Sequence, residues 1–241
     1  MSNKKRSYHL SFFLSILAMS SCTTIGPRPD SKVMDNHPQY WLTTSMYAGQ
    51  FYDDDKLMLL DFRPFDAIDY ARTIDGYTIY PKPANRIIQA GTKIKLVGID
   101  VPDEQTRWLR PLFSPKEHIW VYLKVAKEHG EVNIFEEKEF ILIPPKHIKT
   151  RQQINQYLSD FLSTKNPNTW ILKEPTHIRD AIYGKRPVMG MNPRQLRATL
   201  GPALSRQYPN DKDTADPVEL WHYDNYFVVF KDDHIIKLSQ L

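Results

Sequence analysis

Short apolar runs, separated by polar and proline-containing segments, dominate residues 40–147. The run 86–99 shows the clearest alternation, because Ile94 and Leu96 are interleaved with Lys93 and Lys95, as on a half-buried strand. Other runs of strand-forming residues lie at 56–62, 120–125, 132–135 and 140–143. Several short strands at this spacing predict a β-rich domain built like a small barrel or sandwich.

The apolar pattern changes to a helical period after Pro144-Pro145. Thr150 and Gln153 have the spacing of a capping box, in which two side chains satisfy free backbone amides at the start of a helix. An apolar stripe then recurs at helical intervals, at Ile154, Tyr157, Leu158, Phe161 and Leu162. A helix is therefore predicted from residue 150 onward.

Two further helices are predicted from their end signals. One is expected to begin at Pro175 and to end at Gly184. The other has Asn192 as a natural N-cap and Pro193 at the first helical position, and it closes at Gly201-Pro202.

Three strands joined by two tight turns are predicted at 219–223, 226–231 and 234–238. Helices followed by an antiparallel sheet are typical of the α+β class. We therefore expect a β-rich, small-barrel-like domain at residues 40–147. It is followed at 148–241 by a domain of helix, helix and three-stranded antiparallel sheet.

Residues 1–21 have the composition of an export signal. Three basic residues at positions 4–6 precede the apolar run 10–19, and small residues follow it. The run is shorter than the roughly 20 apolar residues that a membrane-spanning helix needs. The ending Met19-Ser20-Ser21-Cys22 resembles the lipobox of bacterial lipoproteins.

The lipobox resemblance implies cleavage before Cys22, a diacylglycerol on its thiol and an acyl group on the new amino terminus. Thr23 follows rather than an aspartate, which by the same resemblance implies the outer membrane, on its periplasmic face. The alternative that stays open is an ordinary secretory signal cut nearby. Cys22 is the only cysteine, and acylation accounts for an unpaired cysteine in an exported chain.

Residues 22–39 contain prolines and a glycine but no sustained apolar period, so we expect a lipidated tether there. The formal net charge of the chain is +4, and residues 1–21 hold three basic side chains and no acidic one. The remainder therefore carries +1, which gives no reason to expect a nucleic-acid partner. Without a second cysteine, packing rather than disulfide bonds must stabilise the fold.

Four short motifs follow one another within residues 176–238. They are Met189-Gly190-Met191, Thr199-Leu200-Gly201-Pro202, Trp221-His222-Tyr223 and the run 228–233, Val-Val-Phe-Lys-Asp-Asp. This arrangement resembles the SmpA/OmlA family of lipoproteins. The resemblance implies a non-catalytic scaffold that presents a sheet and loops to a protein partner. Members of that family usually contain little besides this domain, so its role does not carry over intact to a chain with a preceding β-rich region.

Common motifs of catalysis and metal binding are absent from the sequence. It contains no Gly-x-Ser-x-Gly elbow, no His-Glu-x-x-His, no paired cysteines and no glycine-rich phosphate loop. Asp211, Asp213 and Asp216 do not fit the calcium-loop template, because Ala215 stands at a ligand position. We therefore expect no catalytic residue, no cofactor and no metal site.

Aromatic residues are the candidates for partner contacts. Trp41, Tyr47 and Phe51 follow the tether, and Trp108 lies in the segment 106–113, directly after Arg107. Aromatic side chains are enriched at binding hot spots, so exposed positions would suit a protein or peptidoglycan contact. The alternative, that these residues pack the core, stays open.

Taken together, the residues and resemblances predict a non-enzymatic lipoprotein of the outer membrane. It would act as an accessory binding or scaffold factor in outer-membrane or secretion assembly, with lipid attached at Cys22 and a protein partner in the envelope. Two alternatives remain, a peptidoglycan-binding lipoprotein and an envelope hydrolase with an unrecognised site.

Overall fold

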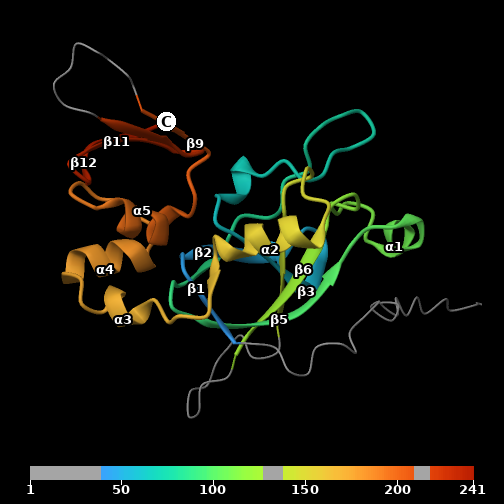
Figure 1. Cartoon of the computed structure of the whole chain (residues 1–241). Coiled ribbons are helices and arrows are strands. Elements are labelled where there is room, and N and C mark those ends of the chain that lie inside the picture. Colours follow the sequence, from blue (N-terminus) through green and yellow to red (C-terminus); the bar gives the residue numbers. More distant parts are fainter. Residues whose placement is uncertain (1–38, 127–137, 209–217) are drawn as a thin grey trace, which may run out of the picture.

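The computed structural model describes residues 39–126, 138–208 and 218–241 (Figure 1). Within these ranges the chain is a mixed α+β protein with one large sheet and one small antiparallel sheet. Cys22, the rest of the predicted tether up to residue 38 and the predicted strand at 132–135 lie outside the described residues, as does Asp211 with its neighbours. None of the helices in the described part is long and apolar enough to cross a bilayer.

The large sheet has eight strands in the order β4-β2-β3-β7-β6-β5-β1-β8. Neighbouring strands are antiparallel, except that β3 and β7 are parallel. The strands are β1 (Tyr40–Leu42), β2 (Met46–Phe51), β3 (Asp54–Asp61), β4 (Arg86–Ile88), β5 (Lys93–Asp100), β6 (Trp120–Val125), β7 (Glu139–Leu142) and β8 (Leu162–Ser163).

Both faces of the central strands β3, β7 and β6 are largely buried, which explains the apolar runs of these strands in the sequence. On β6, Val121 and Leu123 belong to one core, while Trp120 and Tyr122 belong to a second core. Successive residues of a strand point to opposite faces, so the two cores lie on opposite sides of the sheet. The short 3-10 turn Phe65–Ala67 adds Phe65 to the second core.

The small-barrel expectation for residues 40–147 is corrected by this topology. Strands β4 and β8 are edge strands of the described sheet and do not pair with each other, so the sheet is open. A small barrel fills one interior with side chains. This sheet instead stays open and packs a separate core on each face.

The predicted helices are confirmed, with one change of boundary. α2 (Arg151–Ser159) has the Thr150–Gln153 capping box, α4 (Thr176–Tyr183) ends at Gly184, and α5 (Pro193–Leu200) is capped by Asn192. α2 ends earlier than its apolar stripe predicts, because Leu162 is already in β8. The described residues contain two further short α-helices, α1 (Glu104–Leu109) and α3 (Asn168–Ile171).

The C-terminal meander is confirmed and extended by one strand. β10 (Glu219–His222), β11 (Tyr226–Lys231) and β12 (His234–Gln240) follow the predicted order, and β9 (Ser205–Gln207) pairs with β10. The expected three-stranded sheet is therefore four-stranded. Its core, which includes Trp221 and Phe230, packs against α4 and α5.

The change from the first core to the C-terminal core falls after β8. Ile154 and Leu158 of α2, and Leu162 of β8, pack in the same core as the large sheet. β8 also pairs with β1, through Trp41 and Ser163. α2 and β8 therefore lie with the β-rich part of the structure.

Residues 43–45, between β1 and β2, join the two parts of the molecule. The Thr44 hydroxyl donates to the carbonyl of Arg197 at 2.7 Å, and the Ser45 amide donates to the carbonyl of Ala198 at 2.9 Å. The Ser45 hydroxyl donates to Ile182 at 2.8 Å and accepts from the amide of Ala90 at 3.0 Å. These buried hydrogen bonds fix α4 and α5 against the large sheet.

Candidate functional site

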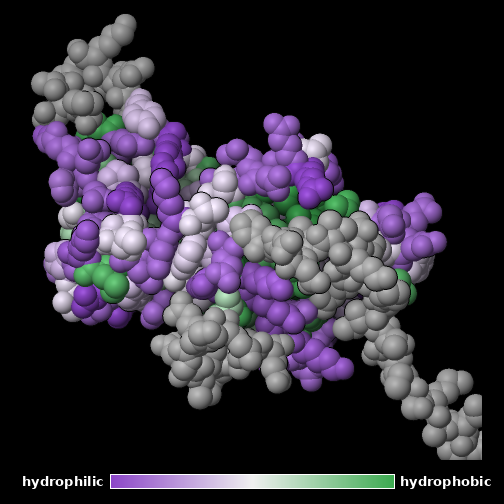
Figure 2. All heavy atoms as spheres, turned by 60° about the horizontal axis from the view of Figure 1, so that its bottom comes forward, coloured by the Kyte–Doolittle hydropathy of each residue, from purple (hydrophilic) through white to green (hydrophobic). Residues whose placement is uncertain are grey.

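An exposed apolar segment projects between β5 and β6. Residues 101–113 include α1 and expose several large apolar side chains, with Trp108 86% accessible. The exposed apolar residues of this segment are Val101, Trp108, Leu109, Leu112 and Phe113. Figure 1 shows α1 at the end of the molecule away from α3, α4 and α5, and Figure 2 shows hydrophobic surface mainly over the β-rich part.

The buried side chain of Arg110 holds this segment in place. Its guanidinium pairs with the carboxylate of Asp100 at 2.8 Å, and it donates to the carbonyls of Lys116 and His118 at 2.7 and 2.6 Å. It also lies over the ring of Trp120, 4.1 Å from the centroid. One buried arginine thus ties the end of β5 to the segment that leads into β6.

Further local interactions also hold the segment 101–113 in place. Asp103 and Thr106 form a capping box at the start of α1, and Arg107 pairs with Glu117 at 3.2 Å. The indole nitrogen of Trp120 donates to the carbonyl of Pro115 at 3.0 Å. The apolar side chains are therefore displayed on a fixed scaffold.

A second feature is an open groove of about 660 Å³ where the two parts meet. Its walls come from the end of α2, from residues 163–170, from α5 and from β9. Ligand-binding clefts usually enclose about 300–1,000 Å³, so this groove has room for a small ligand. Among the described residues, its charged lining side chains are Lys165, Arg194, Arg197 and Arg206, with Asp160 as the one opposing carboxylate.

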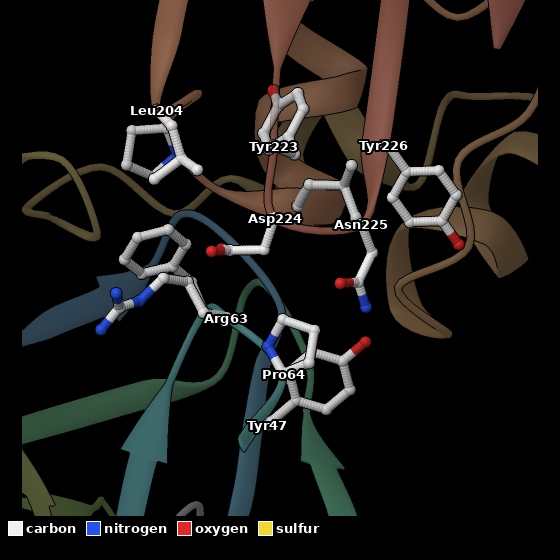
Figure 3. Close-up of a pocket in the computed structure, with 11 residues that line it drawn as sticks. Tyr47, Arg63, Pro64, Leu204, Tyr223, Asp224, Asn225 and Tyr226 are labelled. Carbon is white, nitrogen blue, oxygen red and sulfur yellow. The ribbon is translucent and has the colours of Figure 1, made fainter. Parts of the chain in front are cut away.

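A much smaller pocket lies between the end of β3 and the β10–β11 turn (Figure 3). Asp224 and Asn225 reach into it from the turn, Tyr47 and Pro64 line the opposite wall, and Arg63 flanks it. Burial raises the pKa of Asp224, and nearby Arg63 acts in the opposite direction. The cavity of about 50 Å³ is too small for a metabolite, since ligand sites are several times larger.

The predicted aromatic contact residues are placed in different environments. Phe51 is fully buried against Trp120 and Tyr52, so the partner contact predicted for it is wrong and it packs the core. Trp41 is half-buried in β1, with the Lys93 ammonium 5.7 Å from its ring centroid. Tyr47 is half-buried beside the small pocket. Of the four, Trp108 alone is widely exposed, and the structure does not bring these aromatics together.

The basic groove was not predicted from the sequence. Arg194 and Arg197 are three residues apart on α5, a spacing that places both on one helix face. Arg206 comes from β9 and Lys165 from the segment after β8, and only the folded chain brings them to the same groove. Part of the signal was therefore present in the helix pattern, and the rest depends on topology.

Carboxylates and other metal ligands are dispersed in the described part of the chain. Within residues 39–126, 138–208 and 218–241, no three His, Asp or Glu side chains are placed to hold a metal ion together. In that part of the chain, the small pocket is lined by one carboxylate, Asp224, and the groove by one, Asp160. Neither contains the facing pair of carboxylates that acid–base hydrolysis of a glycoside uses.

No protein-family model, curated protein or solved structure matches the chain. The resemblance to the SmpA/OmlA family therefore rests on the C-terminal motifs alone. Of these, Gly201 closes α5, and Trp221 and Phe230 lie in the core that α5 covers.

Proposed function

We propose that the protein is a non-catalytic lipoprotein of the outer membrane, attached through Cys22, that binds a protein partner in the envelope. It serves as an accessory factor in outer-membrane or secretion assembly. The lipobox-like ending at Cys22 supports the anchor, and the SmpA/OmlA-like motifs support a scaffold role. For the C-terminal part we propose the SmpA/OmlA-like arrangement, with α4 and α5 packed on the small sheet.

The apolar segment 101–113 is the observation that carries the binding role. Fully burying one large apolar side chain is worth about 1.5–3 kcal/mol, and this segment has five such side chains that are between 48% and 86% exposed. Several exposed large apolar side chains gathered on one short segment indicate an interaction site. The buried Arg110–Asp100 pair holds the segment outward, so its exposure is a property of the fold.

The partner contact can be tested by changing only the exposed side chains. Trp108→Ser with Leu112→Ser removes apolar surface from the segment and leaves Arg110 in place. In pull-downs from detergent-solubilised envelopes, we expect the native chain to enrich a membrane complex and this variant to lose at least about 90% of it, as hot-spot residues do. Equal enrichment by both proteins would refute the proposal.

A matched control uses apolar residues that are equally exposed elsewhere. Ile74→Ser with Leu172→Ser removes two exposed apolar side chains outside segment 101–113. This control should capture the complex as the native chain does. Retention of the native protein on purified sacculi, without a membrane complex, would instead favour the peptidoglycan alternative.

The anchor is tested separately. Cys22→Ser removes the thiol that lipidation requires, so the protein should leave the membrane fraction or accumulate as an uncleaved precursor. An unchanged membrane fraction and unchanged processing would rule out lipidation at Cys22. The binding test and the anchor test can fail independently.

A further inference from the structure

We infer that the groove between α2, α5 and β9, called here the arginine groove, binds a phosphorylated sugar. Its cationic side chains are Lys165, Arg194, Arg197 and Arg206. The inference uses a different surface from the apolar segment 101–113 and does not depend on a protein partner.

Three arginines of the groove lie over aromatic rings. The Arg194 guanidinium carbon lies 4.1 Å from the ring centroid of Trp170. Arg197 and Arg206 lie 5.4 and 4.3 Å from the ring centroid of Trp221. A guanidinium that stacks through its face keeps its N–H donors in its plane, where they can form paired hydrogen bonds to a phosphate.

These donors are not used by acids in the described structure. Among residues 39–126, 138–208 and 218–241, no carboxylate forms an ion pair with Arg194, Arg197 or Arg206. The charged side chains lining the groove sum to +3, whereas the chain after residue 21 carries +1. A cleft lined by one sign of charge raises the local concentration of the opposite ion. The arginine groove is therefore suited to an anion with several acceptor oxygens.

The remaining lining points to a ligand that also carries hydroxyl groups. The hydroxyls of Thr43, Ser159 and Thr169 each donate to a backbone carbonyl, at 3.1, 2.6 and 2.9 Å. Their oxygens keep lone pairs that can accept from a ligand. Asp160 adds a carboxylate acceptor, whose pKa is raised by burial against the opposing effect of Arg197 and Arg206.

A sugar phosphate matches both kinds of lining. Its phosphate accepts from the guanidinium groups, and its hydroxyls donate to the acceptor oxygens of the groove. An acidic peptide would also bring backbone N–H donors, but each of its carboxylates has only two acceptor oxygens, whereas a phosphate offers three to the guanidinium groups of the groove. The phosphorylated sugar could be soluble or the headgroup of a glycolipid, and the headgroup source rests on the proposed membrane anchor.

Calorimetry on the full-length protein in neutral detergent tests this inference. Glucose 6-phosphate, inorganic phosphate, glucose and hexaglutamate are titrated separately. We expect glucose 6-phosphate to bind about tenfold more tightly than inorganic phosphate or glucose, and the affinity to fall with added salt. Equal affinity for inorganic phosphate, or tighter binding of hexaglutamate, would overturn the proposal.

Variants locate the binding to the groove. Arg194→Gln with Arg197→Gln should weaken glucose 6-phosphate binding at least about tenfold, because charge-assisted hydrogen bonds are lost. Arg179→Gln with Arg186→Gln changes the net charge equally outside the groove and should bind normally. An equal loss in both pairs would show that net charge alone matters and would refute the site. Lys165→Gln, which leaves both stacked rings unchanged, should also bind more weakly and guards against misfolding of the arginine variant.

Two ligand sources are separated by one further comparison. Micelles that carry a glycolipid with a phosphorylated glucosamine headgroup are compared with micelles of the same lipid without phosphate. Preference for the phosphorylated micelles that disappears in Arg194→Gln with Arg197→Gln assigns the groove to a membrane headgroup. Binding of glucose 6-phosphate without that preference assigns it to a soluble sugar phosphate.

Discussion

The side-chain nitrogen of Lys185 donates a hydrogen bond of 2.6 Å to the carbonyl of Ser45. It donates a second hydrogen bond, of 2.9 Å, to the carbonyl of Thr199, so one lysine links the large sheet to α5. Lys185 is only 3% exposed, and burial lowers its pKa from 10.5 to about 7, with Asp61 acting in the opposite direction. The contact between the two parts of the molecule is therefore sensitive to pH.

Lys185→Met should flatten the pH dependence of stability. Between pH 7 and 10.5 the unfolded chain binds a proton at Lys185 that the folded chain releases, so the free energy of unfolding rises with pH. The expected slope from this group is at most about 1.4 kcal/mol per pH unit, and it vanishes below pH 7. Urea unfolding at several pH values measures it. Lys173→Met, at an exposed position, should keep the native slope; a native slope in Lys185→Met would contradict the assignment.

Gly201→Ala should destabilise the protein by about 2–4 kcal/mol, from backbone strain and a steric clash together. Gly201 has φ +91°, which L side chains rarely adopt, and an added Cβ would lie 2.7 Å from the ring of Phe62. Thermal and urea unfolding report the loss. Gly190→Ala has a similar φ of +79° with open space around the added Cβ, so it should cost only about 1 kcal/mol. Equal losses would mean that contact with Phe62 contributes nothing.

The elements that could be predicted are those whose sequence pattern reflects burial. β6, β7 and the second half of β3 are buried on both faces, and their sequences are mostly apolar for that reason, with Lys124 of β6 as a half-buried exception. β8 has two residues and β9 is exposed throughout, so their strand state comes from their partners rather than from an apolar pattern. Open rather than barrel-like pairing could not be predicted, because strand order is set by contacts between distant segments.

The candidate sites, like the fold, could be predicted from the sequence only in part. The apolar residues around Trp108 read equally well as core or as contact surface, and the difference is made by Arg110, whose partners are Asp100 and carbonyls beyond the segment. Helical spacing indicates that Arg194 and Arg197 share a face. Nothing in the sequence indicates that the guanidinium of Arg197 lies over the ring of Trp221, 24 residues further along the chain.

Arg110→Met should cost about 3–5 kcal/mol of stability, because it leaves a buried carboxylate and several carbonyls without their donor. Oδ1 of Asp100 already has no hydrogen-bond partner in the described structure, so the carboxylate depends on this pair. Urea unfolding measures the loss. Adding Asp100→Asn should recover part of it, since the unpaired charge is then removed. Arg107→Met, at the exposed pair with Glu117, should cost less than about 1 kcal/mol; a similar cost at both positions would remove the special role of Arg110.

His118→Phe should reduce the loss of stability in mild acid. Burial lowers the pKa of His118 from 6.5 to about 4, with a smaller effect in the same direction from Lys146, Lys149 and Arg110, and an opposing one from Glu117. Between pH 4 and 6.5 the unfolded chain binds a proton at this histidine and the folded chain does not. The free energy of unfolding therefore falls as the pH falls. The group contributes at most about 1.4 kcal/mol per pH unit in this window, and nothing further is lost below pH 4. Phenylalanine keeps an aromatic ring against Tyr70, which lies 5.3 Å from the imidazole centroid, and has no proton to bind. The difference in unfolding free energy between native and variant proteins should therefore change across pH 4–6.5 and stay constant above it.

A control at the exposed His177, changed to Phe, should follow the native curve. A pH-independent difference for His118→Phe would show that this ring titrates alike in the folded and unfolded chains.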